Sequence, residues 1–124
     1  MKERIVIPAE NENGLNARLS GHFGRAPYFV IVDLNENGEI LNVNVIPNTS
    51  EHFGGVGRPV DRILQFNPDA VITYDMGPRA LSIFQEARVA VLRANANIIR
   101  EVIEAYKRNM LEELTEGCRR ARHG

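Results

Sequence analysis

Histidine, arginine and glycine gather in one short stretch of the sequence, SGHFGRAP, which covers residues 20–27. His22 offers a titratable nitrogen that is also a common metal ligand, and Arg25 offers a permanent positive charge. Glycine accepts unusual backbone angles and lets a partner approach the main chain closely. One interpretation of these residue types in one turn is a binding loop for a metal-containing or anionic ligand. The other is a solvated surface histidine beside an arginine that pairs with a surface carboxylate.

A second histidine precedes a glycine-rich turn. His52 and Phe53 are followed by Gly54, Gly55 and Gly57. The turn lacks the lysine of a phosphate-binding loop and the spacing of a dinucleotide site, so it is either a ligand-binding turn or simply a tight one. Phe53, like Phe23, lies between a histidine and a glycine, and both rings are expected to cover the edge of the core.

The last residues carry a further pair of metal-ligand types. Cys118 and His123 are separated by arginines within residues 115–124, which are predicted to form a flexible tail. A mobile basic end is one interpretation of this segment. The other is that the thiolate and the imidazole fold back as ligands, with the arginines lowering the pKa of the thiol. The single cysteine excludes an internal disulfide and a four-cysteine cluster site.

No catalytic set is visible in the sequence. There is no serine-histidine-acid pattern, no metalloprotease helix and no acidic cluster for two metals. Asp75 and Met76 follow an expected strand, but aspartate is also a routine helix cap. The sequence therefore predicts a binding protein and not an enzyme.

Composition excludes several other classes of function. The chain has 124 residues and a net charge of −1, with acids and bases evenly mixed, which argues against general nucleic-acid binding. Its longest apolar runs fall far short of the roughly 20 residues that span a bilayer and of a signal peptide's core. We expect a single cytoplasmic domain, residues 1–124, that is a monomer or a weak dimer.

Hydrophobic periodicity predicts five strands and three helices. The expected strands cover residues 4–8, 28–34, 39–47, 70–74 and 88–92, with a hairpin turn at 35–38. The first expected helix has Pro59 in its first turn and ends near Phe66. The second covers residues 79–87. The third is capped by Asn95 or Asn97, and its inner stripe is Ile99, Val102, Ile103, Tyr106 and Met110. Residues 9–27 show no period, as expected of a long functional or disordered loop.

Connection rules turn these elements into a fold. Strand-helix-strand connections are right-handed and parallel, so the third, fourth and fifth strands should run in the same direction. If the first strand lies between the second and fourth, the sheet order is 3-2-1-4-5 and only the second strand is reversed. Helices then cover both faces in three α/β/α layers. In this arrangement the loops holding His22, His52, Asp75 and Asn95 meet at one sheet edge, where open α/β sheets bind ligands. Two helix starts there favour an anion.

Three segments, HFGRAPYFVIVD, EHFGGVGRPVDRIL and DAVITYDMGPRALSIFQEARVAV, resemble the dinitrogenase iron-molybdenum cofactor biosynthesis family, of the nitrogenase accessory factor (NifX/NafY-like) type. The resemblance covers about residues 4–110 and is most specific at residues 22–27. It implies a ribonuclease-H-like fold and the binding or delivery of iron-sulfur or iron-molybdenum cofactor precursors. One departure is Tyr74-Asp75-Met76, where relatives commonly have a glycine-like turn.

The resemblance and the residues together give a candidate site. A preformed cluster brings its own bridging sulfides, so one or two histidine or cysteine contacts with surrounding positive charge suffice. The expected metal ligands are His22, His52, Cys118 and His123. The expected cofactor-binding residues are His22, Phe23, Gly24, Arg25, His52, Gly54, Gly55, Gly57 and Gly77. Cluster-assembly or acceptor proteins are the implied partners. The alternative is a small-anion-binding or protein-interaction module without a metal role.

Overall fold

The structure, a computed structural model, describes residues 2–49 and 58–115. The elements in chain order are β1 (Glu3–Ala9), a 3-10 helix η1 (Gly14–Asn16), β2 (Tyr28–Leu34), β3 (Ile40–Pro47), α1 (Pro59–Leu64), β4 (Ala70–Thr73), α2 (Pro78–Glu86), β5 (Ala90–Arg93) and α3 (Ile99–Lys107). Their number and order confirm the predicted strands and helices. None of the described helices is long and apolar enough to cross a membrane.

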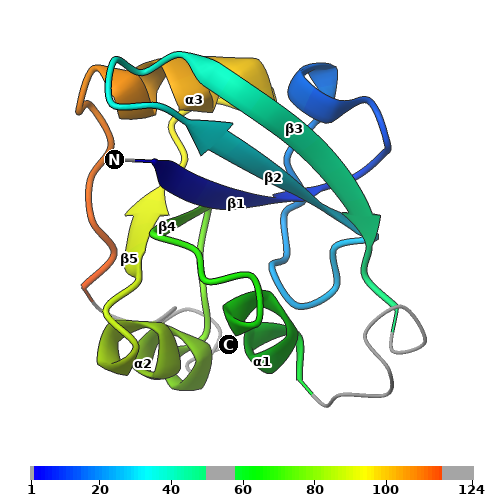
Figure 1. Cartoon of the computed structure of the whole chain (residues 1–124). Coiled ribbons are helices and arrows are strands. Elements are labelled where there is room, and N and C mark those ends of the chain that lie inside the picture. The colour runs from blue at the N-terminus through cyan, green and yellow to red at the C-terminus, as the bar shows by residue number, and fades with distance from the viewer. Residues whose placement is uncertain (1, 50–57, 116–124) are drawn as a thin grey trace.

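The five strands form one mixed sheet in the predicted order β3-β2-β1-β4-β5. β2 runs antiparallel to both of its neighbours, β1 and β3, whereas β1, β4 and β5 are parallel. α3 lies on one face of the sheet, and α1 and α2 lie side by side on the other (Figure 1). The three-layer α/β/α architecture with a ribonuclease-H-like motif is therefore confirmed.

The core has two halves because the central strands are buried on both faces. Ile5 and Ile7 of β1 point into the half beneath α3, where they join Ile99, Val102 and Ile103. Val6 points into the opposite half, which includes Ile63 of α1 and Leu81 and Phe84 of α2. Continuous apolar runs such as Ile5-Val6-Ile7 are typical of strands covered on both sides.

Residues 9–27 are more ordered than a free loop. They contain η1, and single bridges join Leu19 to Ala9 and Arg18 to Ile98. Ala17 and Leu19 are buried beneath α3. The segment is therefore packed against the sheet, and its last part, residues 20–27, is held in place on the α1 and α2 side.

The start and end of α3 differ from the prediction. Neither Asn95 nor Asn97 caps it, since the residue preceding the helix is the extended Ile98. The backbone around Ile98 instead bonds to the long loop, from Leu19 N to Asn97 O at 2.9 Å and from Ile99 N to Ala17 O at 3.0 Å. Because these bonds hold the chain extended at Ile98, the helix begins only at Ile99.

The predicted inner stripe of α3 is also wrong at its last position. The helix ends at Lys107, and Asn109 adopts a left-handed backbone with φ of 57°. Met110 consequently leaves the helical face and is 64% exposed.

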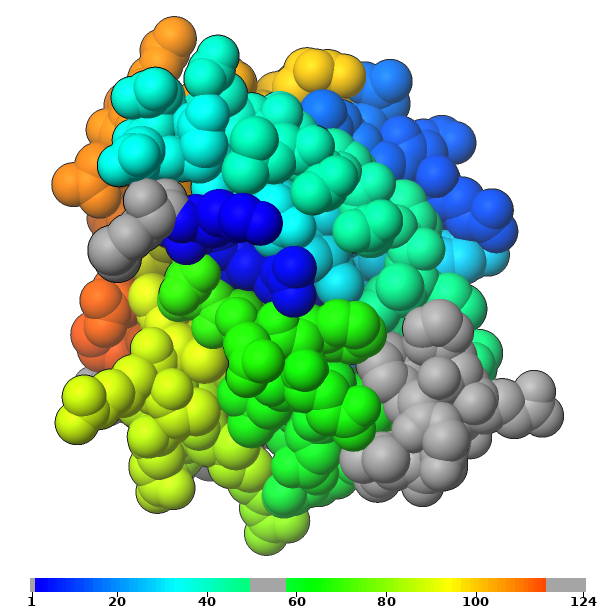
Figure 2. Space-filling view, viewed as in Figure 1, coloured from blue at the N-terminus to red at the C-terminus, as the bar shows by residue number. Residues whose placement is uncertain are grey.

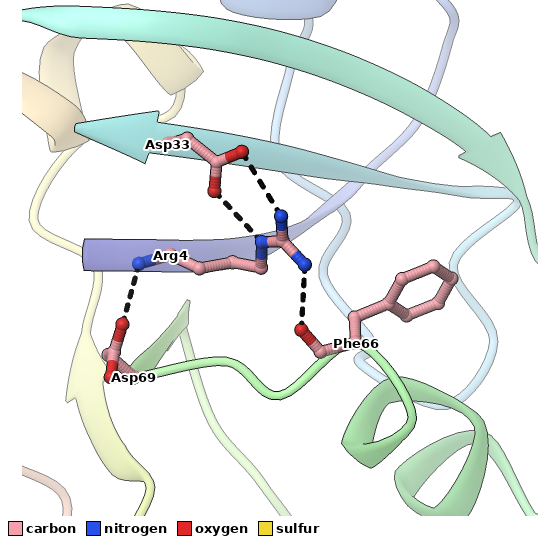
Figure 3. A network of polar contacts seen from close by, with 4 residues as sticks. All are labelled: Arg4, Asp33, Phe66 and Asp69. Carbon is pink, nitrogen blue, oxygen red and sulfur yellow. Dashed lines mark hydrogen bonds and ion pairs between the residues drawn. The ribbon is translucent and has the colours of Figure 1, made fainter. Parts of the chain in front are cut away.

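A polar network centred on Arg4 joins β1 to β2 and to the connection between α1 and β4 (Figure 3). The Arg4 guanidinium donates to Asp33 Oδ1 at 2.8 Å and to the Phe66 carbonyl at 2.9 Å, while the Arg4 amide donates to Asp69 Oδ2. The Asp33 side chain is only 6% exposed. Asp33 raises the pKa of Arg4, and a buried carboxylate of this kind requires such a partner.

We predict that Asp33→Asn lowers the free energy of unfolding by about 2 kcal/mol, because it removes the charge that Arg4 compensates within the sheet. Glu104→Gln is the matched control. It neutralises a carboxylate of the same kind in the exposed Lys107–Glu104 pair and should cost less than about 0.5 kcal/mol. Urea unfolding measures both values. Equal losses would show that the Arg4 network contributes no more than a surface ion pair.

Candidate functional site

A pocket of about 520 Å³ opens at the sheet edge where β1 and β4 end. Its walls come from the loop before β2, the start of α1, and the turn between β4 and α2. The described residues lining it are Gly21, His22, Phe23, Gly24, Arg25, Arg58, Pro59, Val60, Asp75, Met76, Gly77, Arg79 and Ala80. The structure thus brings together His22, Phe23, Gly24, Arg25 and Gly77 of the predicted set.

The loop that holds His22 is fixed at both ends by hydrogen bonds. Ser20 is buried; its amide donates to the Pro8 carbonyl at 3.0 Å, and its hydroxyl accepts from the His22 amide at 3.2 Å. At the other end, the Asn48 side chain donates to the carbonyls of Gly24 and Ala26. The loop is therefore bound to the ends of β1 and β3, with the His22 and Arg25 residues exposed between these anchors.

Phe23 anchors the same loop in the core. It is only 6% exposed, and its ring centroid lies 5.3 Å from that of Phe29 and 5.6 Å from that of Phe84. The edge-on contact with Phe84 is a favourable aromatic geometry. Phe23 therefore covers the edge of the core, as predicted, while it also lines the pocket.

The glycines of the pocket are not required by backbone strain. Gly21, Gly24 and Gly77 all lack the positive φ that would demand glycine, and a Cβ at these positions would meet nothing closer than Pro59 Cγ at 3.9 Å from Gly24. The fold would accept larger residues there. Their small size instead leaves open space along the pocket, as a site that admits a bulky ligand needs.

Positive charge surrounds the pocket. Arg25, Arg58 and Arg79 line it and are exposed, and Asp75 is the only acid among its described lining residues. Arg58 is ion-paired with Asp61 at 2.9 Å, and the hydrogen bond lowers the pKa of that carboxyl. We name Arg25, Arg58 and Arg79 the arginine rim.

Sequence reasoning missed Arg58 and Arg79. A signal was present, because each arginine adjoins the proline that begins a helix, in Arg58-Pro59 and Pro78-Arg79. Since both helices begin at the strand ends, both charges are placed beside the same loop. The interior of the pocket is apolar, formed by the buried Phe23, Val60 and Met76.

The predicted metal ligands are only partly placed. His22 lines the pocket, whereas His52, Gly54, Gly55 and Gly57 and the tail residues Cys118 and His123 lie outside the described residues. Within residues 2–49 and 58–115, no three histidine, cysteine or acidic side chains come together as a metal site. That His52, Cys118 and His123 act as metal ligands stays a prediction.

The fold and pocket define a three-layer α/β domain with a positively charged pocket at its strand ends. The sequence family described as dinitrogenase iron-molybdenum cofactor matches residues 3–109, so the chain belongs to that family. The family resemblance found in the sequence is thereby confirmed.

Individual relatives are similar to this chain over most of its length. The uncharacterized protein MJ0580 of Methanocaldococcus jannaschii is 37% identical over 112 residues, which cover 89% of this chain and 90% of MJ0580. The structure of PH0822 superposes with a TM-score of 0.72 at 32% identity, covering 90% of this chain and 96% of PH0822. The NMR structure of TM1290 from Thermotoga, proposed to be a NifB protein, gives a TM-score of 0.75 at 30% identity over 94% of this chain and 97% of TM1290.

We predict that Gly21→Ala leaves the free energy of unfolding unchanged or raises it by a few tenths of a kcal/mol, because its backbone and surroundings accept a Cβ. Gly38→Ala is the comparison, since Gly38 has φ of 80° in the β2–β3 hairpin. That change should cost about 1 kcal/mol. Urea unfolding of both variants tests the difference. A comparable loss at Gly21 would mean that its glycine serves the fold and not the pocket.

Proposed function

We propose that the pocket binds a preformed, negatively charged metal-sulfur cluster of the iron-sulfur or iron-molybdenum type, or its precursor, and that the protein carries this cargo during cofactor assembly. The observation that carries the proposal is the combination of an apolar interior with an arginine rim around an exposed histidine. Membership of the dinitrogenase iron-molybdenum cofactor family supports the same class of cargo.

The apolar interior favours a soft cluster over a small oxyanion. Phosphate is strongly hydrated, and moving it against Phe23, Val60 and Met76 would remove water without replacing its hydrogen bonds. A metal sulfide is large, polarizable and carries its charge on sulfur. It can lie against the aromatic ring and the Met76 thioether while its charge faces the arginine rim.

His22 is the residue we propose as a direct ligand. Its side chain lines the pocket, and its backbone is held by the hydroxyl of Ser20. An imidazole nitrogen can replace an exchangeable ligand on a cluster whose other coordination sites are already filled by sulfide. One or two such contacts would give binding that is reversible, as transfer to another protein requires.

Binding, and not catalysis, is the activity we propose. Among the described residues lining the pocket, His22 and Asp75 are the groups that could act as a nucleophile, and no serine, threonine, cysteine or lysine accompanies them. Cluster-assembly or acceptor proteins would be the partners, and the cytoplasm the compartment, as the sequence predicts. The alternative is a small-anion or protein-interaction role, and the phosphate titration below tests its small-anion form.

We predict that the apo-protein binds a thiolate-capped synthetic [4Fe–4S] cluster under strict anaerobiosis, giving visible absorption that co-elutes with protein. His22→Ala should weaken binding about tenfold or more, through loss of an iron ligand. Gly24→Leu should also weaken it, since a larger side chain beside Pro59 fills the pocket. Alanine variants of His52, Cys118 and His123 extend the same titration to the three predicted ligands that lie outside the described residues.

Two outcomes would contradict the proposal. One is an absence of cluster binding by the folded wild-type protein. The other is equal binding by wild type, His22→Ala and Gly24→Leu, which would place the cluster elsewhere. Inorganic phosphate binding at the pocket without cluster binding would instead support the small-anion alternative.

The arginine rim generates a separate prediction. Arg25→Gln should weaken cluster binding about threefold at low salt, and the difference from wild type should shrink as the salt concentration rises, because exposed charges are screened. Arg108→Gln is the matched control, since Arg108 is also exposed but lies beyond α3 and outside the pocket. Equal effects of the two substitutions on cluster binding would show that the protein's net charge, and not the position of Arg25 at the pocket, sets the affinity.

A further inference from the structure

The two edge strands of the sheet, β5 and β3, differ in whether described residues of the chain pair with their outer edges. The outer edge of β5 is covered by the chain itself, through hydrogen bonds from Arg93 N to Glu112 O at 2.8 Å and from Leu114 N to Val91 O at 2.7 Å. On the opposite side, no described residue pairs with the outer edge of β3. Among the described residues β3 is therefore an open edge strand that spans the molecule (Figure 1), and its residues form a continuous band on the surface (Figure 2).

β3 lacks the usual charged protection of an edge strand. Its sequence, ILNVNVIP, contains no charged residue, and Ile40 and Leu41 are 38% and 45% exposed. Exposed edges are normally protected from pairing by charged residues, proline or bulges. β3 has the last two only at its ends, where Pro47 closes the strand. The register shift against β2 falls beside Leu41, which leaves residues 42–46 as a regular stretch.

The backbone groups of this stretch point outward at alternate residues. Asn48 N donates to Pro27 O at 3.0 Å, which makes 27 and 48 a hydrogen-bonded pair. Antiparallel pairs alternate, so the even-numbered residues 42, 44 and 46 bond to β2. The N–H and C=O groups of Val43 and Val45 consequently face away from the sheet, available to another strand.

We infer that this edge is a self-association surface, on which β3 of a second copy of the chain pairs antiparallel across a twofold axis at Asn44. The stretch Val43-Asn44-Val45 reads the same in both directions. Each Val43 therefore meets the other copy's Val45 in a hydrogen-bonded pair, giving about four backbone hydrogen bonds. On one face Val43 lies opposite Val45, and on the other Asn44 lies opposite Asn44 with Asn42 opposite Ile46 on either side of it.

The absence of charge on β3 favours a second copy, because two such strands approach without repulsion and without a buried unpaired charge. The contact is small, so the dimer is weak and depends on protein concentration. Antiparallel pairing places the carboxyl ends of the two β3 strands at opposite ends of the joined sheet. Both pockets, which lie at the carboxyl-end edge, stay accessible in the dimer.

Sedimentation between about 10 µM and about 1 mM protein tests this surface. The wild type should shift toward the dimer as concentration rises. Asn44→Lys places two like charges opposite each other and should remain monomeric, with circular dichroism confirming its fold. Asn37→Lys, in the exposed β2–β3 turn, adds the same charge away from the strand and should dimerise like wild type. A monomeric wild type throughout this range, or an Asn44→Lys dimer, overturns the inference.

A disulfide tests the register. In non-hydrogen-bonded antiparallel pairs the Cα atoms lie about 4.5 Å apart, within the range of a disulfide. In a Cys118→Ser background, Asn44→Cys should form a covalent dimer under mild oxidation, and Asn37→Cys should not. Equal crosslinking of the two variants would overturn the twofold axis at Asn44.

Discussion

The position of β1 in the middle of the sheet is the constraint on which the rest of the structure depends. β1 pairs antiparallel with β2 along its whole length and parallel with β4 on its other side. Its residues Ile5, Val6 and Ile7 are fully buried. Because β1 and β4 are parallel, the segments that follow them leave the sheet at the same edge. The pocket exists because these two segments meet there.

The loop after β1 divides anchoring and binding between neighbouring residues. Ser20, Phe23 and Ala26 are buried and attach the loop to the sheet and core, whereas His22 and Arg25 are exposed. A short segment can therefore be held rigidly while it presents polar side chains to a ligand. This arrangement reduces the entropy lost when a ligand is bound, because little of the loop must become ordered. Phe23, which lies between His22 and Gly24, is one of the buried anchors in this division.

Local patterns were enough to predict the elements, and together with one assumption on the first strand they gave the strand order, but they did not predict contacts between distant charges. Alternation and apolar runs predicted β2 at its observed bounds, and the handedness rule made β3, β4 and β5 parallel. The place of β1 between β2 and β4 was a condition of the predicted order, which the structure confirms. The Arg4–Asp33 pair joins residues far apart in sequence, and nothing in the local pattern indicates it. Arg58 and Arg79 likewise became site residues only after α1 and α2 were placed together. Met110 failed as a core residue because backbone geometry at Asn109 ended the helical periodicity.

The balance between charge and apolar surface in the pocket bears on how a cargo would be held. The arginines of the rim are exposed, so each contributes a modest, salt-sensitive attraction, and Arg58 contributes least because Asp61 already pairs with it. Such charges speed the encounter with an anion more than they slow its departure. Selectivity must then come from the buried interior of Phe23, Val60 and Met76, which disfavours strongly hydrated anions. A site built in this way would take up a soft anionic cluster quickly and release it readily, which are the two properties that a carrier needs.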